Sequence, residues 1–257
     1  MWRHLLNYRI FEFEGLTVIT DDHKEQDGPQ MMFPLSEEGI TPEICAMIPK
    51  IAEAVGVKTL SPLTLDMARA VEGAFPELIA SANRDLFDYV YLSSDLAELG
   101  GRKYHQKRNH ISAFTSAYPY KFELIDSKNL PLLKEAAETL YALSGGGLED
   151  EYRAIGEVIE NFETLDLRAA VLTVNSQIVA YTIGEKANDD TAIIHIEKAN
   201  RDFAGAYATI NNMFAKSQFA DLTYINREED MGIDGLRKAK LSYNPHHFNE
   251  AYVIDLK

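Results

Sequence analysis

Apolar and polar positions in the second half of the chain switch repeatedly between the period of a strand and that of a helix. Alternating β-prone runs predict strands, and apolar residues three or four positions apart predict helices. The resulting order is strand, two helices, three antiparallel strands, helix, strand, helix, strand. Strands are predicted at 120–126, 168–174, 178–184, 191–197, 221–226 and 249–255, and the last two helices after Gly205 and over 233–242.

The first half of the chain is less regular but carries clear local signals. Two β-prone runs around Glu14-Gly15 predict a hairpin. Thr41 followed by Pro42 is typical of a helix start, because threonine caps the first turn and proline fits inside it. The elements predicted here are strands at 9–13, 16–20 and 86–92, a short apolar piece at 31–35, and helices over 42–55 and 95–113.

These two orders predict the domain organisation. The first half resembles the second half without its opening strand and its two helices. We therefore expect an α/β protein of two mixed-sheet domains, 1–118 and 119–257, the first truncated at its N-terminus.

Composition and charge narrow the class of protein. The 257 residues are 46% hydrophobic and 25% charged, as in an ordinary globular protein. There is no apolar run long enough to span a membrane, no secretory signal, and one cysteine, so we expect a cytoplasmic protein. The net charge of −15 opposes bulk binding of nucleic acid. A basic stretch, Arg102–Arg108, is either a site for an anionic ligand or a solvated helix face.

Two segments concentrate polar residues where a strand should end. After the strand at 191–197, the small residues Ala204-Gly205-Ala206 open a helix, whose free N–H groups would suit a phosphate. A plain turn is the alternative. After the strand at 221–226, three acids follow Asn226-Arg227. Such acids repel one another unless cations lie among them, so we expect either a polar network holding a donor group or a surface loop pairing its own charges.

Several familiar chemistries have no sequence pattern here. There is no G-x-S-x-G elbow, no P-loop and no H-E-x-x-H motif. His246-His247 lacks a third ligand at a defined spacing, so no metal site is predicted.

The element order over 120–255 resembles the GNAT family of N-acyltransferases. In that family the pyrophosphate of coenzyme A binds a Q/R-x-x-G-x-G/A turn. That motif maps here to Arg201, Ala204 and Ala206, with alanine at the first glycine position. The resemblance implies coenzyme A binding at this turn, with Gly205 inside it.

A second resemblance covers nearly the whole chain. The strings DYVYLSSDLAELGGRKYHQKRNHISAF, IHIEKA, GAYATIN and INREEDMGIDGLRKAKLSYNP are similar to bacterial DUF2156 proteins, which are related to the C-terminal region of phosphatidylglycerol lysyltransferases. The G-L-R-x-x-K pattern from Gly235 to Lys240 and the following Pro245 are shared with those enzymes. The resemblance implies tandem GNAT-like domains, similar to the Fem-type transferases that take amino acids from aminoacyl-tRNA.

The function expected from these resemblances is transfer of an acyl or aminoacyl group to an amine or hydroxyl. Either acyl-coenzyme A or aminoacyl-tRNA is the expected donor, with a possible contact to the tRNA acceptor end through the basic stretch. The alternative is a ligand-binding module that has lost catalysis.

The expected catalytic residues are Glu197 as base, Glu228 or Asp230 as alternatives, and Tyr243 as acid. The expected donor-binding residues are Lys107, Arg108, Asn109, Arg201, Ala204, Gly205, Ala206, Asn226, Arg227, Arg237 and Lys240. The sequence assigns no oligomeric state. We also predict that Glu228 and Asp230 are partnered by Arg227, Arg237 or Lys240.

Overall fold

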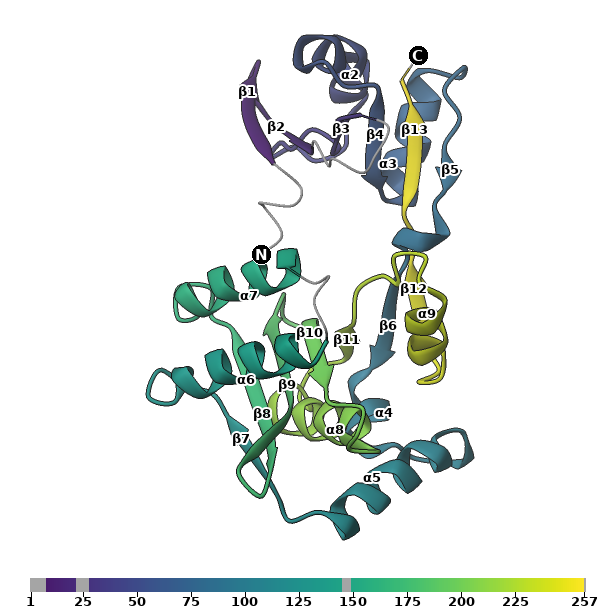
Figure 1. Ribbon diagram of the computed structural model, residues 1–257. Coiled ribbons are helices and arrows are strands. Elements are labelled where there is room, and N and C mark those ends of the chain that lie inside the picture. The colour runs from purple at the N-terminus through teal and green to yellow at the C-terminus, as the bar shows by residue number, and fades with distance from the viewer. Residues whose placement is uncertain (1–7, 22–27, 145–148, 257) are drawn as a thin grey trace. The chain divides into compact units, whose positions relative to one another are not determined.

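The structure is a computed structural model that describes residues 8–21, 28–144 and 149–256. The chain divides into two compact units. Unit one comprises Tyr89–Glu228 and Asp234–Phe248, and unit two comprises Trp2–Asp88, Glu229–Ile233 and Asn249–Lys257. Each unit contains its own mixed sheet (Figure 1), which confirms the α/β class.

Unit one is built on a seven-stranded sheet in the order β12-β6-β11-β10-β9-β8-β7. The strands are β6 (Asp88–Leu92), β7 (Tyr120–Leu124), β8 (Arg168–Val174), β9 (Gln177–Lys186), β10 (Thr191–Ala199), β11 (Tyr224–Asn226) and β12 (His247–Asn249). The helices are α4 (Ser93–Glu98), η2 (Arg102–Tyr104), α5 (His105–Ala117), α6 (Leu130–Leu143), α7 (Glu149–Glu160), α8 (Ala206–Gln218) and α9 (Asp234–Leu241).

Both faces of this sheet are covered, which explains why β8 is buried at every position after Arg168. Ala169 and Val171 pack in one core with residues of α6 and α7. Their neighbour Leu172 packs in another core with Phe114 of α5 and Ile210 of α8. Successive strand residues point to opposite faces, so the sheet lies between α6 and α7 on one side and α5 and α8 on the other.

Unit two is built on a six-stranded sheet in the order β1-β2-β3-β4-β13-β5. The strands are β1 (Arg9–Phe13), β2 (Leu16–Asp21), β3 (Gln30–Met31), β4 (Thr59–Leu63), β5 (Ser81–Ala82) and β13 (Tyr252–Asp255), and the helices are α2 (Pro42–Val55), α3 (Leu65–Ala74) and η1 (Arg84–Leu86). The Thr41 side chain accepts a hydrogen bond from the Ile44 amide and caps α2, as predicted.

The units are assembled differently from the predicted domains. The strand β6, from the first half of the chain, pairs with β11 in the sheet of unit one. The final strand, β13, pairs with β4 and β5 in the sheet of unit two. The expected boundary at 118/119 falls between α5 and β7, inside unit one. Strand pairing over long sequence separation causes this difference, and local periodicity carries no information about it.

The helix predicted over 95–113 is wrong as a single element. The chain forms α4, leaves the helix at Leu99, and resumes through η2 into α5. Leu99 and Gly101 both have positive φ, 51° and 76°. This conformation ends a right-handed helix, and at Leu99 the sequence gives no glycine to indicate it.

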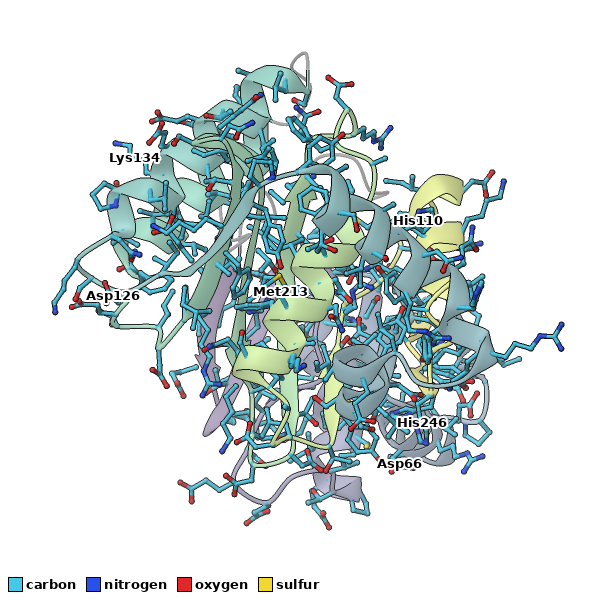
Figure 2. The ribbon with its side chains drawn as sticks, turned by 90° about the horizontal axis from the view of Figure 1, so that it is seen from below. Asp66, His110, Asp126, Lys134, Met213 and His246 are labelled. Carbon is cyan, nitrogen blue, oxygen red and sulfur yellow. The ribbon has the colours of Figure 1, made fainter. Side chains whose placement is uncertain are left out.

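Helix α8 is positioned closely by α5. Figure 2 shows α8, which carries Met213, running beside α5, which carries His110. A Cβ atom at Gly205, the N-cap of α8, would clash with the His110 carbonyl oxygen and lie 2.9 Å from the Phe114 Cβ. Gly205 also has a φ of 93°. Glycine is therefore required here both for backbone conformation and for helix packing.

Candidate functional site

Strands β10 and β11 pair in parallel near the centre of the sheet of unit one. Their described pairing ends at Ile193 and Asn226, while β10 continues to Ala199. Two charged side chains follow that point. Glu197 lies on the extension of β10, and Arg227 is the first residue after β11. The strand ends therefore present an acid and a base beside each other.

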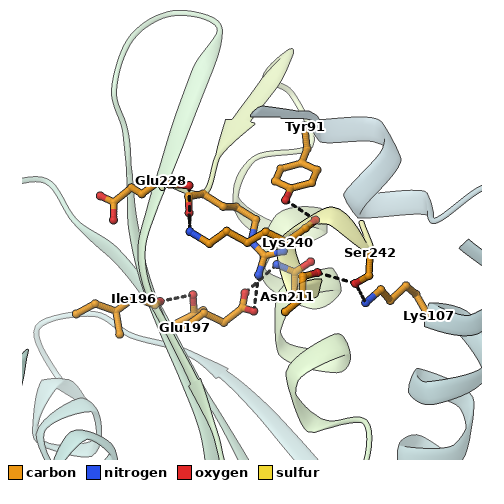
Figure 3. Close-up of polar contacts among 11 residues, drawn as sticks. Tyr91, Lys107, Ile196, Glu197, Asn211, Glu228, Lys240 and Ser242 are labelled. Atoms are coloured by element: carbon orange, nitrogen blue, oxygen red, sulfur yellow. Dashed lines mark hydrogen bonds and ion pairs between the residues drawn. The ribbon is translucent and has the colours of Figure 1, made fainter. Parts of the chain in front are cut away.

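Glu197 and Arg227 form a buried ion pair (Figure 3). The Arg227 Nη2 lies 2.9 Å from Glu197 Oε1, and the two side chains are 11% and 10% exposed. Burial is the largest effect on the pKa of Arg227 and lowers it, but the charges of Glu197, Tyr91 and Tyr243 together outweigh burial, so the net pKa is raised. Arg227 is therefore charged, and Glu197 holds its guanidinium in place.

Asn211 of α8 completes this group and leaves two polar atoms open. Its Nδ2 donates to Glu197 Oε2 at 2.8 Å. Because the amide nitrogen faces the carboxylate, Oδ1 must face away from it. In the described part of the chain, Asn211 Oδ1 and Arg227 Nη1 are both buried without a hydrogen-bond partner. Buried polar atoms without a partner are rare in proteins. The two side chains that bind Glu197 therefore leave one open acceptor, Asn211 Oδ1, and one open donor, Arg227 Nη1.

Two tyrosine rings lie against the Arg227 guanidinium. Its Cζ is 4.8 Å from the centre of the Tyr243 ring and 5.7 Å from that of Tyr91. Burial raises the pKa of both phenols, against the Arg227 charge. The Tyr91 hydroxyl donates to the Lys240 carbonyl oxygen at 2.8 Å. The rings thus hold a cation by cation–π attraction, and Tyr243 stays protonated.

Lys107, on α5, reaches the same tyrosine. Its Nζ lies 3.7 Å from the centre of the Tyr243 ring and 2.6 Å from Ser242 Oγ. Burial and the Arg227 charge lower the pKa of Lys107 to about 8, while Glu197 opposes this shift. Lys107 is therefore a lysine that loses its proton near pH 8 rather than above pH 10, which suits a general base.

Lys240 was expected to hold an anionic donor. In the structure its ammonium group hydrogen-bonds to backbone oxygens. Nζ donates to the carbonyl oxygens of Arg227 at 2.5 Å and of Glu228 at 3.0 Å. The side chain is buried. These bonds fix the chain where it leaves β11, so we assign Lys240 to positioning Arg227.

A second polar group surrounds His195. Its Nδ1 lies 2.8 Å from Glu228 Oε1 and its Nε2 lies 3.1 Å from Glu185 Oε1. Burial is the largest effect on the pKa of His195 and lowers it. The hydrogen bonds and charges of Glu228 and Glu185 together raise the pKa by more than burial lowers it, so the net pKa is raised. His195 lies where the β9–β10 register shifts between Ile194 and Ile196, and such bulges re-aim side chains.

The acids after β11 are partnered, but not simply as predicted. Glu228 is bonded to His195, a residue outside the predicted set. Its φ is 56°, and its amide donates to Asn226 Oδ1 at 2.8 Å. Asp230 belongs to unit two, where its carboxylate is fully buried and pairs with Arg84 at 3.3 Å. Its other oxygen accepts from the Gly232 amide. These contacts give Asp230 a structural role in the loop.

The remaining predicted donor-binding residues lie on α5, on α9 and at the turn before α8. Arg108 donates to the carbonyl oxygens of Leu99 and Gly101, behind the end of α4. Asn109 lies on an exposed part of α5, near His105. Arg201 and Ala204 are exposed in the turn before α8, and Ala206 is buried at its start. Arg237 lies half-buried on α9.

Sequence reasoning missed five residues of these groups: Tyr91, Glu185, His195, Asn211 and Ser242. Asn211 had a signal, because a polar residue stands on α8 between the apolar positions Ile210 and Phe214. Ser242 and Tyr91 had none, since serine and tyrosine are ordinary in a helix end and a buried strand. No group of three or more histidine, cysteine, aspartate or glutamate side chains is arranged for a metal ion within the described ranges.

The whole-chain comparison decides the family. A family model described as phosphatidylglycerol lysyltransferase, C-terminal, matches residues 1–255. The chain belongs to this family. The resemblance to DUF2156 proteins is thereby confirmed. Within 8–21, 28–144 and 149–256, none of the helices has the length and apolar character needed to cross a bilayer.

Solved structures share the fold of this chain. A conserved protein of unknown function from Bacteroides thetaiotaomicron is 36% identical, with a TM-score of 0.84, over 100% of this chain and 88% of that chain. A C-terminal DUF2156 domain from Agrobacterium fabrum is 14% identical, with a TM-score of 0.70, over 100% and 86%. At that identity the likeness shows the fold alone.

The fold is also that of wider transferase families. FemX matches with a TM-score of 0.61 at 9% identity, over 100% of this chain and 90% of that one. A tandem GNAT protein from the clavulanic acid pathway matches at 0.50 and 10% identity, over 94% and 79%. The GNAT-like and Fem-type fold is thus confirmed. A curated relative from Mycoplasmoides gallisepticum is 22% identical over 176 residues, 65% of this chain and 55% of that protein, so the match spans about half of it.

Proposed function

We propose that the protein is an aminoacyltransferase, moving an aminoacyl group from a nucleic-acid ester to an amine or hydroxyl. The observation that carries this proposal is the pair of unpartnered buried atoms beside Glu197, Arg227 Nη1 and Asn211 Oδ1. An aminoacyl ester has a carbonyl oxygen that accepts a hydrogen bond and an amino group that donates one. The first suits Arg227 and the second suits Asn211.

The same pair argues against a simple acyl group as the natural substrate. An acetyl group has no donor for Asn211 Oδ1, which would stay buried and unpaired at a cost of about 1–3 kcal/mol. Sites that hydrogen-bond a substrate N–H reject analogues that lack it. An aminoacyl donor is therefore favoured over acetyl-coenzyme A.

The turn before α8 points the same way. In GNAT enzymes this turn holds the coenzyme A pyrophosphate, but here α5 packs against it so closely that no side chain fits at Gly205. The first glycine position of the motif is Ala204. The alanine where the motif has glycine supports a donor other than coenzyme A.

The basic start of α5 supports a nucleic-acid donor. Arg102 and Lys103 lie there on a chain of net charge −15, and Lys103 also pairs with Asp95 at 2.8 Å. Arg102 and Lys103 are exposed. We propose that this surface contacts phosphates of the donor near its acceptor end, since Lys and Arg contacts to phosphates supply affinity without sequence preference.

Lys107 is proposed to handle the proton. A neutral Lys107 takes the proton from the attacking group while the carbonyl carbon is attacked, and returns it to the leaving ribose oxygen. Glu197, the base expected from sequence, is less suited, because Arg227 and Asn211 occupy its two carboxylate oxygens. We propose that Glu197 positions Arg227 instead, and that Tyr243 holds both cations.

The test is transfer of a radiolabelled amino acid from mixed aminoacyl-tRNA to small amines and alcohols. Asn211→Leu should reduce transfer, whereas Arg102→Glu should weaken donor binding and Lys134→Glu, the same charge change at an exposed site on α6, should not. Transfer of acetyl groups from coenzyme A by the wild type, with none from tRNA, would overturn the proposal. Donor binding without transfer would support the alternative of an inactive binding module.

A further inference from the structure

We propose that Ser242 is a nucleophile that carries the acyl group covalently, with Lys107 as its base. This inference rests on the proposed function, because it places an intermediate in the same transfer. It would make the reaction a two-step exchange through an acyl-enzyme.

The geometry is that of a serine–lysine pair. Lys107 Nζ, on α5, lies 2.6 Å from Ser242 Oγ, which directly follows α9 (Figure 3). A nucleophile and base within hydrogen-bond reach are the signature of an activated hydroxyl, and serine–lysine pairs are one known form of it. Ser242 is exposed, so its oxygen can be reached by a substrate.

The surroundings of Lys107 favour the base form of its amine. The charged and titratable groups that face it are Arg227, Glu197 and Tyr243. Arg227 repels the ammonium, and burial penalises it, while Glu197 is already paired with Arg227. The lowered pKa of Lys107 agrees with this arrangement. Burial and a neighbouring cation are the means by which lysine is made a base near pH 7–8.

The hydroxyl hydrogen of Ser242 has two possible acceptors. In the structure Oγ lies 2.5 Å from the Ala239 carbonyl oxygen, to which it donates while Lys107 donates to it. When Lys107 loses its proton, its lone pair becomes the second acceptor. Rotation about the Cβ–Oγ bond then directs the hydroxyl hydrogen to Nζ, without movement of either heavy atom.

The proposed reaction has two steps, acylation of Ser242 and transfer to the acceptor. Neutral Lys107 takes the Ser242 proton while Oγ bonds to the ester carbonyl carbon of the donor. The bond from that carbon to the donor oxygen breaks, and Lys107 gives its proton to the leaving oxygen. An amine or hydroxyl then attacks the Ser242 ester, Lys107 takes the proton of the attacking group, and Ser242 Oγ recovers a proton from Lys107 as it leaves.

The experiment uses the whole chain and alanine p-nitrophenyl ester as the probe. After an acid quench, intact mass and peptide mapping should find one alanyl group on Ser242, removable by hydroxylamine because it is an ester. Ser242→Ala should lose the adduct, and Ser112→Ala, an exposed serine on α5, should keep it. Lys107→Arg keeps a cation on Tyr243 but removes the base, so adduct formation should slow by about 10²–10⁴-fold. In the wild type the rate should rise with pH through about 8.

The outcomes separate this inference from the proposed function. A hydroxylamine-resistant alanyl group on Lys107 would overturn the serine assignment, as would an adduct that persists in Ser242→Ala. Transfer from aminoacyl-tRNA without any adduct, and undiminished in Ser242→Ala, would overturn the covalent step and leave the proposed function standing. A Ser242 adduct in a chain that does not use aminoacyl-tRNA would support the nucleophile and overturn the proposed donor.

Discussion

Arg227 and Glu197 join two strands at the point where their pairing stops. The β10–β11 ladder ends at Ile193 and Asn226, and beyond it the guanidinium of Arg227 lies 2.9 Å from the carboxylate of Glu197. The ion pair therefore replaces backbone hydrogen bonds as the link between these strand ends. Since Asn211 binds the same carboxylate from α8, one acid connects two strands and a helix.

This arrangement predicts a large stability loss when one partner is removed. Arg227→Met leaves the Glu197 carboxylate buried beside an apolar group, so the free energy of unfolding should fall by about 3–5 kcal/mol. Urea denaturation measures it. The matched control is Lys121→Met, which breaks the more exposed pair with Glu123 in the same unit and should cost less than about 1 kcal/mol. Equal losses in both variants would contradict the buried pair.

Neutralising both partners should cost less than the two single losses added together. The double variant Glu197→Gln, Arg227→Met carries no unpaired buried charge, so its loss should be smaller than the sum of the two single losses. Strict additivity in this double-mutant cycle would mean that the two side chains do not interact.

Gly205 predicts a second, purely steric effect. Gly205→Ala places a methyl group against the His110 carbonyl oxygen and forces a φ of 93° on an L-residue. We expect a loss of about 1–3 kcal/mol, as for other overpacked sites. Gly156→Ala is the control, because Gly156 lies in α7 with no atom near its Cβ position, and this change should stabilise by about 0.5–1 kcal/mol. Thermal unfolding of both variants measures whether Gly205→Ala is less stable and Gly156→Ala more stable than wild type.

Local features of this fold were predictable from sequence, and non-local ones were not. The cap at Thr41 and the bounds of α2 follow from residues within one turn. The β8–β9 hairpin follows from Asn175 and Ser176, whose positive φ values of 50° and 64° suit a two-residue turn. The exchange of β6 and β13 between the sheets depends on pairing across much of the chain, which no local pattern encodes.

For the candidate site too, the local features were predictable from sequence and the contacts between distant elements were not. Glu197 and Arg227 stand at strand ends, so their polarity in a buried context was visible in the sequence. Their connection to Asn211 and Lys107 depends on how α8 and α5 pack. The prediction that cations partner the acids used proximity in sequence. The structure brings His195 to Glu228 and Arg84 to Asp230, and both of these partners are distant in sequence from the acids.

His195 predicts a pH-dependent contribution to stability. Its pKa is raised above the ordinary value of 6.5, so the folded state binds its proton more tightly than the unfolded state. The stabilisation is fully present below pH about 6.5 and is lost as pH rises through the raised pKa. The difference in unfolding free energy between wild type and His195→Gln should therefore shrink as pH increases over this range.

The partners of His195 supply the control for this titration. Imidazole chemical shifts in NMR spectra give its pKa directly. Glu228→Gln and Glu185→Gln should each lower that pKa, because each removes one negative charge beside the ring. A titration unchanged in both variants would show that these carboxylates do not hold the imidazolium.

The contribution of Lys107 to stability should depend on pH in the opposite sense to that of His195. Replacing Lys107 should therefore increase stability while removing the proposed base. Its pKa is lowered from 10.5 to about 8, so between these values the unfolded state binds more protons than the folded state. The free energy of unfolding contributed by Lys107 then rises with pH across this window. At pH 7 the partly buried ammonium is a cost, which solvent screening reduces to about 1 kcal/mol. Lys107→Met should therefore be more stable than wild type at pH 7, and this advantage should disappear by pH 10.

Lys107→Arg stays charged throughout, so its stability relative to Lys107→Met should not change through pH 8. Urea denaturation of the three proteins from pH 7 to 10 measures these differences. A Lys107→Met protein that is less stable at pH 7, with no change in the difference up to pH 10, would show that Lys107 is an ordinary charged lysine and would remove the basis for its role as a base.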